Sequence, residues 1–347
     1  MNIIGIDLAK NIFHVCVMNE AGRVLRRKRL SRTRLLENVM QEVGIVAMEA
    51  CGGAHYWARL FESHGYETRI IAAQFVKPFV KSSKNDEIDA EAICEAASRP
   101  QMRFVATRSE EQQDIQNLHR IVERLTKQRT GLANEIRGLL LEYGIVIAKG
   151  ISNVRSQLPT VVELDGSEQS ALWSETFNEL YLEFKALDSR IAHYEKRIKA
   201  IAAGNEICRR LVEIPGVGPR TATAIYAAVG NAKEFKNGRQ FAAWLGLVPR
   251  QHSTGGKPRL GRITKRGDKY IRKLLVLGAR SAAIACARKE AKAMPLNETQ
   301  RWFRTVVKNA GTNKAIVAMA NKTARRIWVV LNGKNFMEPE QLLAMAA

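Results

Sequence analysis

Four acidic residues have types and positions suited to metal-dependent chemistry. Asp7 ends an apolar segment, "NIIGID", and Glu49 ends another, "GIVAME". Asp86 and Asp89 are three residues apart at the start of a predicted helix, in "NDEIDAEAI", so they lie on one helical face. Taken singly, Asp7 can be a turn partner, Glu49 a surface residue and Asp86 a helix cap. Together they suggest a shared cation.

The elements predicted around these acids bring them together. Strands are predicted over 2–8, 12–18, 22–30, 44–49 and 67–72, helices over 32–42 and 55–64 and around Asp86, and a further strand over 102–105. Three meandering strands followed by alternating helices and strands are typical of an RNase H-like α/β domain. Its first and fourth strands are neighbours, so Asp7 and Glu49 are expected side by side. Two Mg²⁺ ions about 3.5–4 Å apart would neutralise four such carboxylates and activate phosphodiester chemistry.

The excess positive charge is concentrated in the last part of the chain. The formal net charge is +21, and residues 208–347 alone carry 27 Lys and Arg against seven Asp and Glu. A solvated basic face is one interpretation, but such one-sided charge favours a polyanionic partner, of which nucleic acid is the usual one. Five scattered cysteines, no signal-like start and no membrane-length apolar run predict a cytoplasmic protein with no membrane partner.

The middle of the chain has heptad spacing. Apolar residues recur at intervals of three and four in two series, which predicts two long helices in a coiled-coil hairpin, within one chain or across a dimer. Arg129 interrupts the first series, and a polar stretch with Gly150, Pro159 and Gly166 separates the two. The first series is Ile115, Leu118, Val122, Leu125, Leu132, Ile136, Leu139 and Tyr143; the second is Leu180, Phe184, Leu187, Ile191, Tyr194, Ile198 and Ile201.

A helix-hairpin-helix pattern opens the basic region. In "LVEIPGVGPRTATAIYAAVG", residues 211–230, Gly216 and Gly218 permit a tight turn that presents backbone N–H groups at the start of the second helix. This favours a contact with the DNA backbone. An ordinary helical turn is the alternative.

Ser253 lies in a basic, glycine-rich segment, before Thr254 and Gly255-Gly256. Between Arg250 and Lys289 there are 12 Lys and Arg and one acid, Asp268. A nucleophilic serine and a phosphate-contacting loop serine are both compatible with this pattern. The adjacent His252 is disfavoured as a base, because neighbouring side chains often point apart. The predicted nucleic-acid contacts are Arg250, Lys257, Arg259, Arg262, Lys265, Arg266, Lys269 and Arg272.

Several stretches resemble the insertion-sequence 110 family of transposases, the DEDD recombinases guided by a bridge RNA. They are "IGIDLAK", "MEACGG", "KNDEIDAEAI", "IPGVGPRTATAI" and "FAAWLGLVPRQHSTGGKPRLGRITKRGDKYIRKLLVLGA", in the order of the family. The resemblance implies that Asp7, Glu49, Asp86 and Asp89 bind Mg²⁺ in a RuvC-like domain. It implies that Ser253, with Thr254 as a minor rival, forms a covalent link to DNA. It also implies a bridge RNA, donor and target DNA, and a composite site that can draw on two protomers.

The predicted organisation has three parts. A RuvC-like catalytic domain is expected over 1–107, a coiled-coil oligomerisation region over 108–205, and a mainly α-helical transposase domain over 206–347. The expected function is Mg²⁺-dependent strand cleavage and exchange through a serine–DNA link, in a dimer or tetramer. A RuvC-like nuclease that uses water and a non-catalytic nucleic-acid-binding protein are the rival hypotheses.

Overall fold

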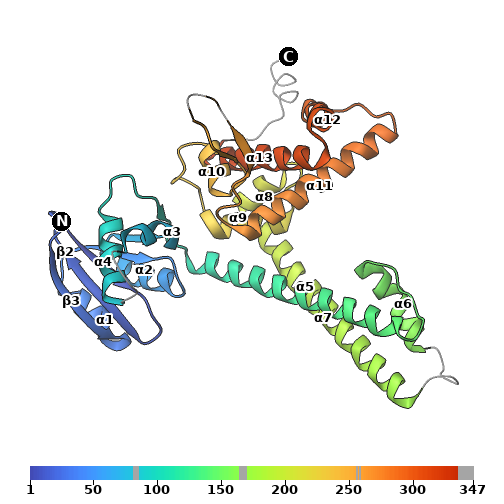
Figure 1. Ribbon diagram of the computed structural model, residues 1–347, viewed down its shortest axis with the longest axis horizontal. Helices are drawn as coiled ribbons and strands as arrows, with labels where there is room; N and C mark the ends of the chain where they lie inside the picture. Colours follow the sequence, from blue (N-terminus) through green and yellow to red (C-terminus); the bar gives the residue numbers. More distant parts are fainter. Residues whose placement is uncertain (81–85, 164–169, 255–256, 258, 335–347) are drawn as a thin grey trace. The chain divides into compact units, whose positions relative to one another are not determined.

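The chain divides into two compact units, Met1–Glu111 and Gln112–Ala347. The structure, a computed structural model, describes residues 1–80, 86–163, 170–254, 257 and 259–334 (Figure 1). The side chains of Asp86 and Glu87 lie outside this description. Within the described part, none of the helices combines the length and apolar character that a bilayer crossing requires.

The first unit is built on a six-stranded mixed sheet with strand order β3-β2-β1-β4-β5-β6. The first three strands form an antiparallel meander, while β4 is parallel to β1 and β5 is parallel to β4. The first and fourth strands are therefore neighbours, in agreement with the RNase H-like prediction. The strands are β1 (Asn2–Asp7), β2 (Ile12–Met18), β3 (Val24–Ser31), β4 (Gly44–Glu49), β5 (Thr68–Ile71) and β6 (Phe104–Val105).

Helices cover both faces of this sheet. Side chains of α1 (Arg32–Val39) and α2 (Ala54–Ser63) share one apolar cluster with Ile4, Ile6, Val46 and Met48. Side chains of α3 (Ala73–Val76) and α4 (Asp86–Ala97) share another with Ile3, Ala47 and Ile71. Buried strands covered on both faces read as continuous apolar runs, which explains the composition of β1 and β4.

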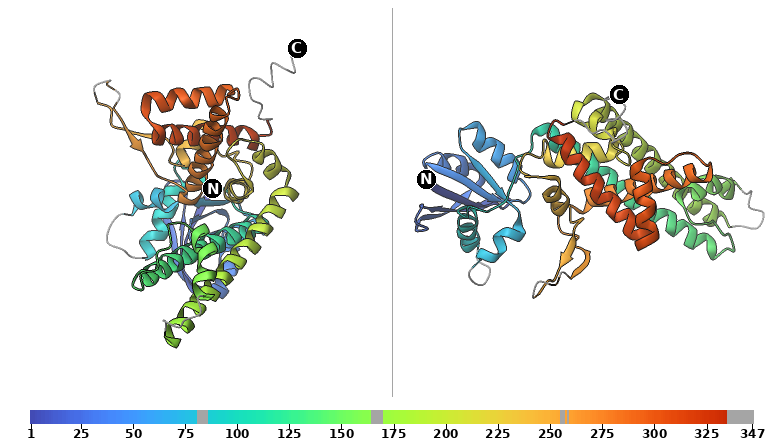
Figure 2. Two further views of the ribbon diagram at one scale, coloured as in Figure 1. Left: turned by 90° about the vertical axis from the view of Figure 1, so that its right-hand side faces the viewer. Right: turned by 90° about the horizontal axis from the view of Figure 1, so that it is seen from above.

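In the second unit, a cluster of three helices includes the predicted long pair. Side chains of α5 (Glu110–Leu141), α6 (Ile151–Glu163) and α7 (Ala171–Gly204) form one buried cluster. Leu187 and Ile191 of α7 are buried in it, so this seam is closed within a single chain. The view from above in Figure 2 shows the long helices together.

The predicted seam was wrong at three points. Tyr143, the last member of the first series, is 57% exposed. Leu139 is 41% exposed, and Leu140 is buried in its place. The connection read as polar contains α6, which buries Val154, Leu158 and Val161 although Pro159 lies inside the helix. Their spacing of four and three residues is itself a helical signal.

The rest of the second unit is a helical core with one small hairpin. Six helices bury the largest apolar cluster of the described residues, and β7 (Pro249–Gln251) pairs antiparallel with β8 (Leu260–Ile263). The helices are α8 (Glu206–Val212), α9 (Pro219–Val229), α10 (Gly238–Trp244), α11 (Lys269–Ala291), α12 (Glu298–Ala310) and α13 (Thr312–Leu331).

Candidate active site and nucleic-acid interface

Two of the predicted acids end neighbouring parallel strands. Ile6 of β1 is opposite Met48 of β4, and Asp7 and Glu49 are the next residues of their strands. Successive side chains alternate between the faces of a sheet. Both acids therefore belong to the face that carries Ile3 and Ala47, which is the face covered by α4.

Gly5 allows α4 to approach β1 closely. A Cβ atom built at Gly5 would lie 2.5 Å from the carbonyl oxygen of Ala90 and 2.6 Å from Sγ of Cys94. In the absence of a side chain, the backbone N–H of Gly5 donates to Cys94 Sγ at 3.1 Å. Asp89 directly precedes Ala90, so this contact holds Asp89 near the carboxyl end of β1.

The charges of the three described acids interact. Burial raises the pKa of Glu49, and the carboxylates of Asp7 and Asp89 raise it further, while Lys77 opposes the shift. Burial also raises the pKa of the neighbouring Cys51 thiol, and the charges of Glu49 and Asp7 raise it further. The structure thus brings Asp7, Glu49 and Asp89 into electrostatic contact. Asp86 begins α4, but its side chain lies outside the described residues.

The donor set fits a hard divalent cation. Carboxylate oxygens are the ligands that Mg²⁺ prefers, and the repulsion that raises the pKa of Glu49 is what a cation would relieve. Among the side chains that the structure describes, no three acidic, histidine or cysteine groups are arranged so that they could hold one ion. The side chain of Asp86, the fourth member of the predicted set, is not among those described.

Ser253 is exposed just beyond β7. Its Oγ accepts a hydrogen bond from Nε2 of Gln251 at 2.9 Å and another from the backbone N–H of Arg259 at 3.2 Å. Donors aimed at a hydroxyl oxygen favour its deprotonated form and stabilise negative charge that develops there. The local geometry is therefore compatible with a nucleophilic serine. Gly255 and Gly256 lie outside the described residues.

The neighbouring residues of Ser253 have different surroundings. The backbone N–H of His252 donates to the carbonyl of Arg259 at 2.9 Å. The described part of the chain offers no polar partner to the His252 ring, which gives no support to a role as base. Thr254 forms an isolated antiparallel bridge with Lys257.

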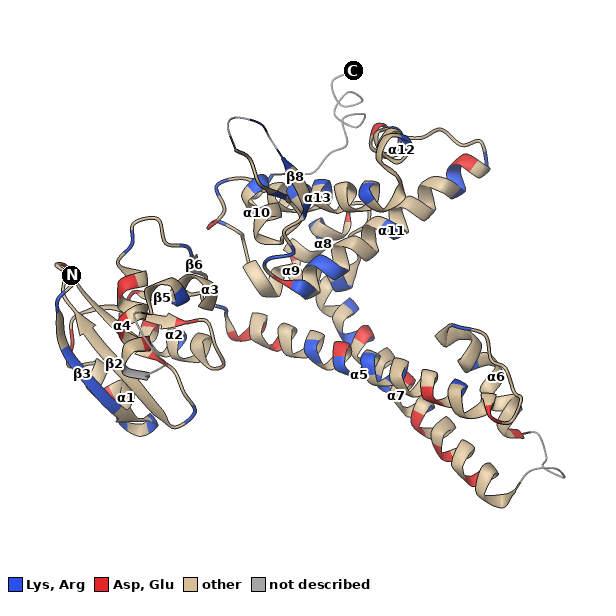
Figure 3. Cartoon of the chain, viewed as in Figure 1, with Lys and Arg blue, Asp and Glu red and all other residues tan. Residues whose placement is uncertain are grey.

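The predicted cationic residues are mostly exposed. Lys and Arg mark β8, α11 and α13 in Figure 3. Arg272 differs, because its guanidinium donates to the carbonyls of Leu245 at 3.0 Å and Arg266 at 3.2 Å. It holds the segments on either side of the hairpin, so its observed contacts are with protein. The exposed members are Arg250, Lys257, Arg259, Arg262, Lys265, Arg266 and Lys269.

The turn between α8 and α9 packs tightly on α11. Gly216 has φ +87°, and a Cβ atom there would lie 2.9 Å from the carbonyl oxygen of Gly278. Gly218 precedes α9 as its N-cap residue, and Pro219 takes the first helical position. These residues form the tight turn between two helices that the sequence predicted. Their contact with a DNA backbone is a prediction.

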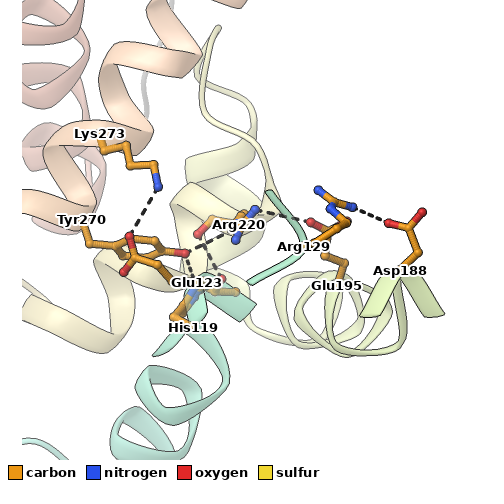
Figure 4. A network of polar contacts seen from close by, with 9 residues as sticks. His119, Glu123, Arg129, Asp188, Glu195, Arg220, Tyr270 and Lys273 are labelled. Atoms are coloured by element: carbon orange, nitrogen blue, oxygen red, sulfur yellow. Dashed lines mark hydrogen bonds and ion pairs between the residues drawn. The ribbon is translucent and has the colours of Figure 1, made fainter. Parts of the chain in front are cut away.

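A buried polar network joins this turn to α5 and α11 (Figure 4). Thr223 Oγ1 donates to the carbonyl of Pro219 at 2.9 Å and lies 3.0 Å from Nε2 of His119. His119 therefore carries its proton on Nε2. Its Nδ1, 3.0 Å from the Tyr270 hydroxyl, then accepts from that group. Arg220 Nε donates to the Tyr270 oxygen at 3.2 Å.

This network keeps His119 neutral and fixes the ends of two helices. Burial, followed by the charge of Arg220, lowers the pKa of His119 to about 4. Tyr270 lies in the first turn of α11, just after the segment that carries Ser253, and Arg220 lies in the first turn of α9. The network thus fixes, relative to α5, the turn before α9 and the Ser253 segment before α11, which are the two predicted DNA contacts.

Sequence reasoning missed Lys77, Gln251 and His119. Gln251 had a signal, because a residue two positions before Ser253 on an extended strand points to the same side. His119 also had one, since it lies four residues after Ile115 and three before Val122, within the apolar series. Lys77 had none, because its approach to Glu49 depends on how the segment after β5 folds back.

Comparison with known proteins places these features in a family. A family model described as Transposase, for the DEDD type of IS110, matches residues 4–145, and one described as Transposase IS116/IS110/IS902 family matches residues 208–294. A probable family 20 transposase of Pseudomonas aeruginosa is 45% identical, with 97% of this chain and 98% of that protein covered. The chain belongs to the IS110 family of transposases.

Other members of the family align over similar lengths. The transposase for insertion sequence element IS1111A of Coxiella burnetii is 44% identical, with 95% of this chain and 90% of that protein covered. The transposase for insertion sequence element IS1328 of Yersinia enterocolitica is 41% identical, with 95% and 96% covered. The acids of this IS110-family chain lie in the first matched region and Ser253 in the second.

The close packing at Gly5 predicts a steric defect. Gly5→Ala should displace α4 from β1 and lower the free energy of unfolding by about 1–3 kcal/mol, with loss of recombination. Thermal and urea unfolding of the full chain measure the stability. Gly52→Ala is the matched control for stability, since an added Cβ there meets none of the described atoms within 4 Å. Wild-type stability in Gly5→Ala would contradict the packing argument.

The raised pKa of Glu49 predicts a stabilising but inactivating substitution. Above the folded-state pKa the ionised carboxylate is disfavoured in the folded protein, so Glu49→Gln should be more stable than wild type at pH 7 without divalent metal. Below the unfolded-state pKa of about 4.3 both forms are neutral, and the difference should vanish. Thermal unfolding against pH measures this, with the exposed Glu37→Gln as control. A Glu49→Gln variant less stable at pH 7 would refute the repulsion.

The neutral His119 predicts acid sensitivity. Because its folded-state pKa is lowered from 6.5 to about 4, the unfolded chain binds a proton first as the pH falls. Stability should therefore be lost between those values, by at most about 1.4 kcal/mol per pH unit. His119→Gln should remove that part of the slope in urea unfolding of the full chain. His193→Gln, at an exposed site on α7, should leave the slope as in wild type.

Proposed function

We propose that this chain cuts and rejoins DNA as a transposase, through a covalent link between Ser253 and a DNA phosphate. The observation that carries the proposal is the pair of hydrogen-bond donors at Ser253 Oγ, on an exposed segment rich in Lys and Arg. The family membership of the chain supports an enzyme that modifies DNA, and the relatives it matches are described as transposases.

In the proposed chemistry, the acids bind the metal ion. Asp7, Glu49, Asp86 and Asp89 would hold Mg²⁺, which withdraws charge from the scissile phosphate when it is bound. The electrostatic coupling of Glu49 to Asp7 and Asp89 supports a common site for three of them. We assign Asp86 to it from its position three residues before Asp89 on α4.

The transfer conserves the number of phosphorus–oxygen bonds. Ser253 Oγ loses its proton and bonds to phosphorus, while the bond from phosphorus to O3′ breaks and the departing oxygen is protonated to a 3′-hydroxyl. In the reverse step a 3′-hydroxyl attacks the phosphoserine and releases the serine. Strands can therefore be exchanged without a nucleotide cofactor. Gln251 and the N–H of Arg259 would stabilise the Oγ alkoxide that forms as the proton leaves, before it attacks phosphorus.

The surrounding cations have a binding role. Arg250, Lys257, Arg259, Arg262, Lys265, Arg266 and Lys269 would hold backbone phosphates near Ser253. Gly216 and Gly218 would present the start of α9 to another phosphate. Arg272 contributes by fixing the base of the hairpin, because its guanidinium is bound to two carbonyls.

The acids and the serine belong to different compact units. We propose that a composite site forms from them, within one protomer or between two copies in a dimer or tetramer. Leu187 and Ile191 are buried within the chain, so self-association would use a surface other than this seam. Donor and target DNA and a bridge RNA are the proposed nucleic-acid partners. The RuvC-like, coiled-coil and transposase domains at 1–107, 108–205 and 206–347 belong to the same proposal.

A covalent adduct is the decisive measurement. Wild-type protein incubated with Mg²⁺, guide RNA and a labelled DNA site should retain label after denaturation. Ser253→Ala should lose the label entirely but still bind DNA, because binding rests on the surrounding cations. Thr254→Ala, the matched control, should keep most of the adduct.

Two outcomes would overturn this assignment. An adduct that survives in Ser253→Ala and disappears in Thr254→Ala would make Thr254 the nucleophile. Strand cleavage with no adduct in any variant would mean that water attacks the phosphate, as in a RuvC-like nuclease. Gln251→Leu should lower the rate of adduct formation more than DNA affinity, since it removes one donor to Oγ.

A further inference from the structure

A basic groove lies between α10 and α13, outside the residues assigned to the reaction. It encloses about 470 Å³ and is lined by Asn237, Gly238, Arg239, Lys322, Arg325, Arg326, Trp328 and Val329. One water needs only about 10–15 Å³ of such volume, so the groove is far larger than a site for one small ion. Of the eight described residues that line it, four are cationic and none is acidic.

The cations project from rigid elements. Lys322, Arg325 and Arg326 are three and four residues apart on α13, so they share one face of that helix. Gly238 lets α10 pack against this helix, since a Cβ atom there would lie 3.1 Å from Cα of Arg325. Arg239 follows Gly238 on α10. The spacing of the charges across the groove is therefore set by helix packing.

Two of these four cationic side chains, Lys322 and Arg326, contact other protein groups. Arg326 donates to Thr299 Oγ1 at 2.6 Å, and Lys322 lies 4.5 Å from the centre of the Trp302 ring, which ties both to α12. Arg239 and Arg325 are exposed, and neither has an ion pair or side-chain hydrogen bond among the described residues. Like charges that converge without a counter-charge cost free energy unless an anion joins them.

The apolar part of the groove suits a nucleic-acid strand. Trp328 and Val329 line it beside the cations. The indole N–H of Trp328 donates to the carbonyl of Phe235 at 3.0 Å, which fixes the ring. A sugar–phosphate backbone offers both the charge and the apolar sugar that this lining matches.

A hydrogen bond and the chain itself connect the groove to the segment that carries Ser253. The side chain of Asn321, next to Lys322 on α13, donates to the carbonyl of Leu247 at 3.2 Å, two residues before β7. Helix α10 ends at Trp244 and leads into the same segment. A duplex held near Ser253 extends beyond the cut phosphate, and contacts with its flank would fix its direction.

We propose that the α10–α13 groove binds the sugar–phosphate backbone of duplex DNA that flanks the cleaved phosphate. The proposal rests on the proposed action on DNA but not on the serine link. Its contacts are to phosphate and sugar, so they would add affinity and orientation without reading sequence.

The test is the salt dependence of DNA binding by the full-length chain. Fluorescence anisotropy with a short mixed-sequence DNA duplex gives the affinity at several salt concentrations. The double variant Arg239→Gln with Arg325→Gln should weaken binding roughly tenfold and lower the salt slope by about 2, since each lost phosphate contact removes about 0.9. The conservative Lys replacements at the same two positions should restore most of the slope.

Controls separate this result from general loss of charge and from unfolding. The double variant Lys127→Gln with Arg190→Gln removes two exposed cations from α5 and α7 and should bind like wild type. Unfolding midpoints for all variants are compared by circular dichroism. A wild-type salt slope in the groove variant would overturn the proposal. So would a loss confined to a single-stranded RNA probe of equal length, which would make RNA the occupant.

An independent readout separates this proposal from the serine mechanism. The groove variant should still form the Ser253 adduct when DNA is saturating, because it keeps the reacting residues. Suppose that neither wild type nor any variant forms an adduct, while the groove variant still loses duplex affinity. That result would refute the serine proposal and leave the groove proposal standing.

Discussion

The contact of α4 with β1 at Gly5 is the constraint on which the acidic site depends. Parallel pairing of β1 with β4 brings Asp7 and Glu49 to adjacent strand ends, but it supplies only two carboxylates. The third comes from a helix, which must lie almost on the strand backbone to bring Asp89 near them. Any side chain at position 5 would separate the two elements. Close packing thus places three carboxylates near one another, with Glu49 partly buried among like charges.

The His119 network positions the segment that carries Ser253, as the Gly5 contact positions the acids. The starts of α9 and α11 meet at His119, whose ring accepts a hydrogen bond from Tyr270 of α11 and donates one to Thr223 of α9. Burial excludes the charged imidazolium, so the direction of the hydrogen bonds is fixed near neutral pH. The segment that bears Ser253 precedes α11 directly. Its base is fixed by Arg272, while Ser253 stays exposed, as the proposed attack on a phosphate requires.

Much of the first unit could be predicted because its strands are buried on both faces and read as apolar runs. The order of these strands and the helices between them is typical of an RNase H-like domain, and it predicted that β1 and β4 are neighbours. The α4 approach was less visible, since it depends on the absence of an atom at Gly5. In the second unit periodicity predicted the long helices but placed Leu139 instead of Leu140 in the core. Intervals of three and four do not identify which of two adjacent leucines faces the partner. Helix α6 was missed because the stretch with Gly150, Pro159 and Gly166 was read as a polar connection.

The candidate site shows the corresponding limit for polar residues. Ser253 and the cations around it were visible from residue type and composition, whereas Gln251 and Lys77 act through tertiary geometry. The α10–α13 groove was invisible for the same reason, because Arg239 and Arg325 are far apart in sequence and ordinary in composition. Charge counting locates the basic region but does not separate cations that hold the protein together from those free to meet phosphate. Arg272 and Arg326 are bound to protein groups, whereas Arg239 and Arg325 have no such partner within the part of the chain that the structure describes. The partners of each guanidinium, more than the net charge of the region, therefore determine where a DNA backbone can replace water on this surface.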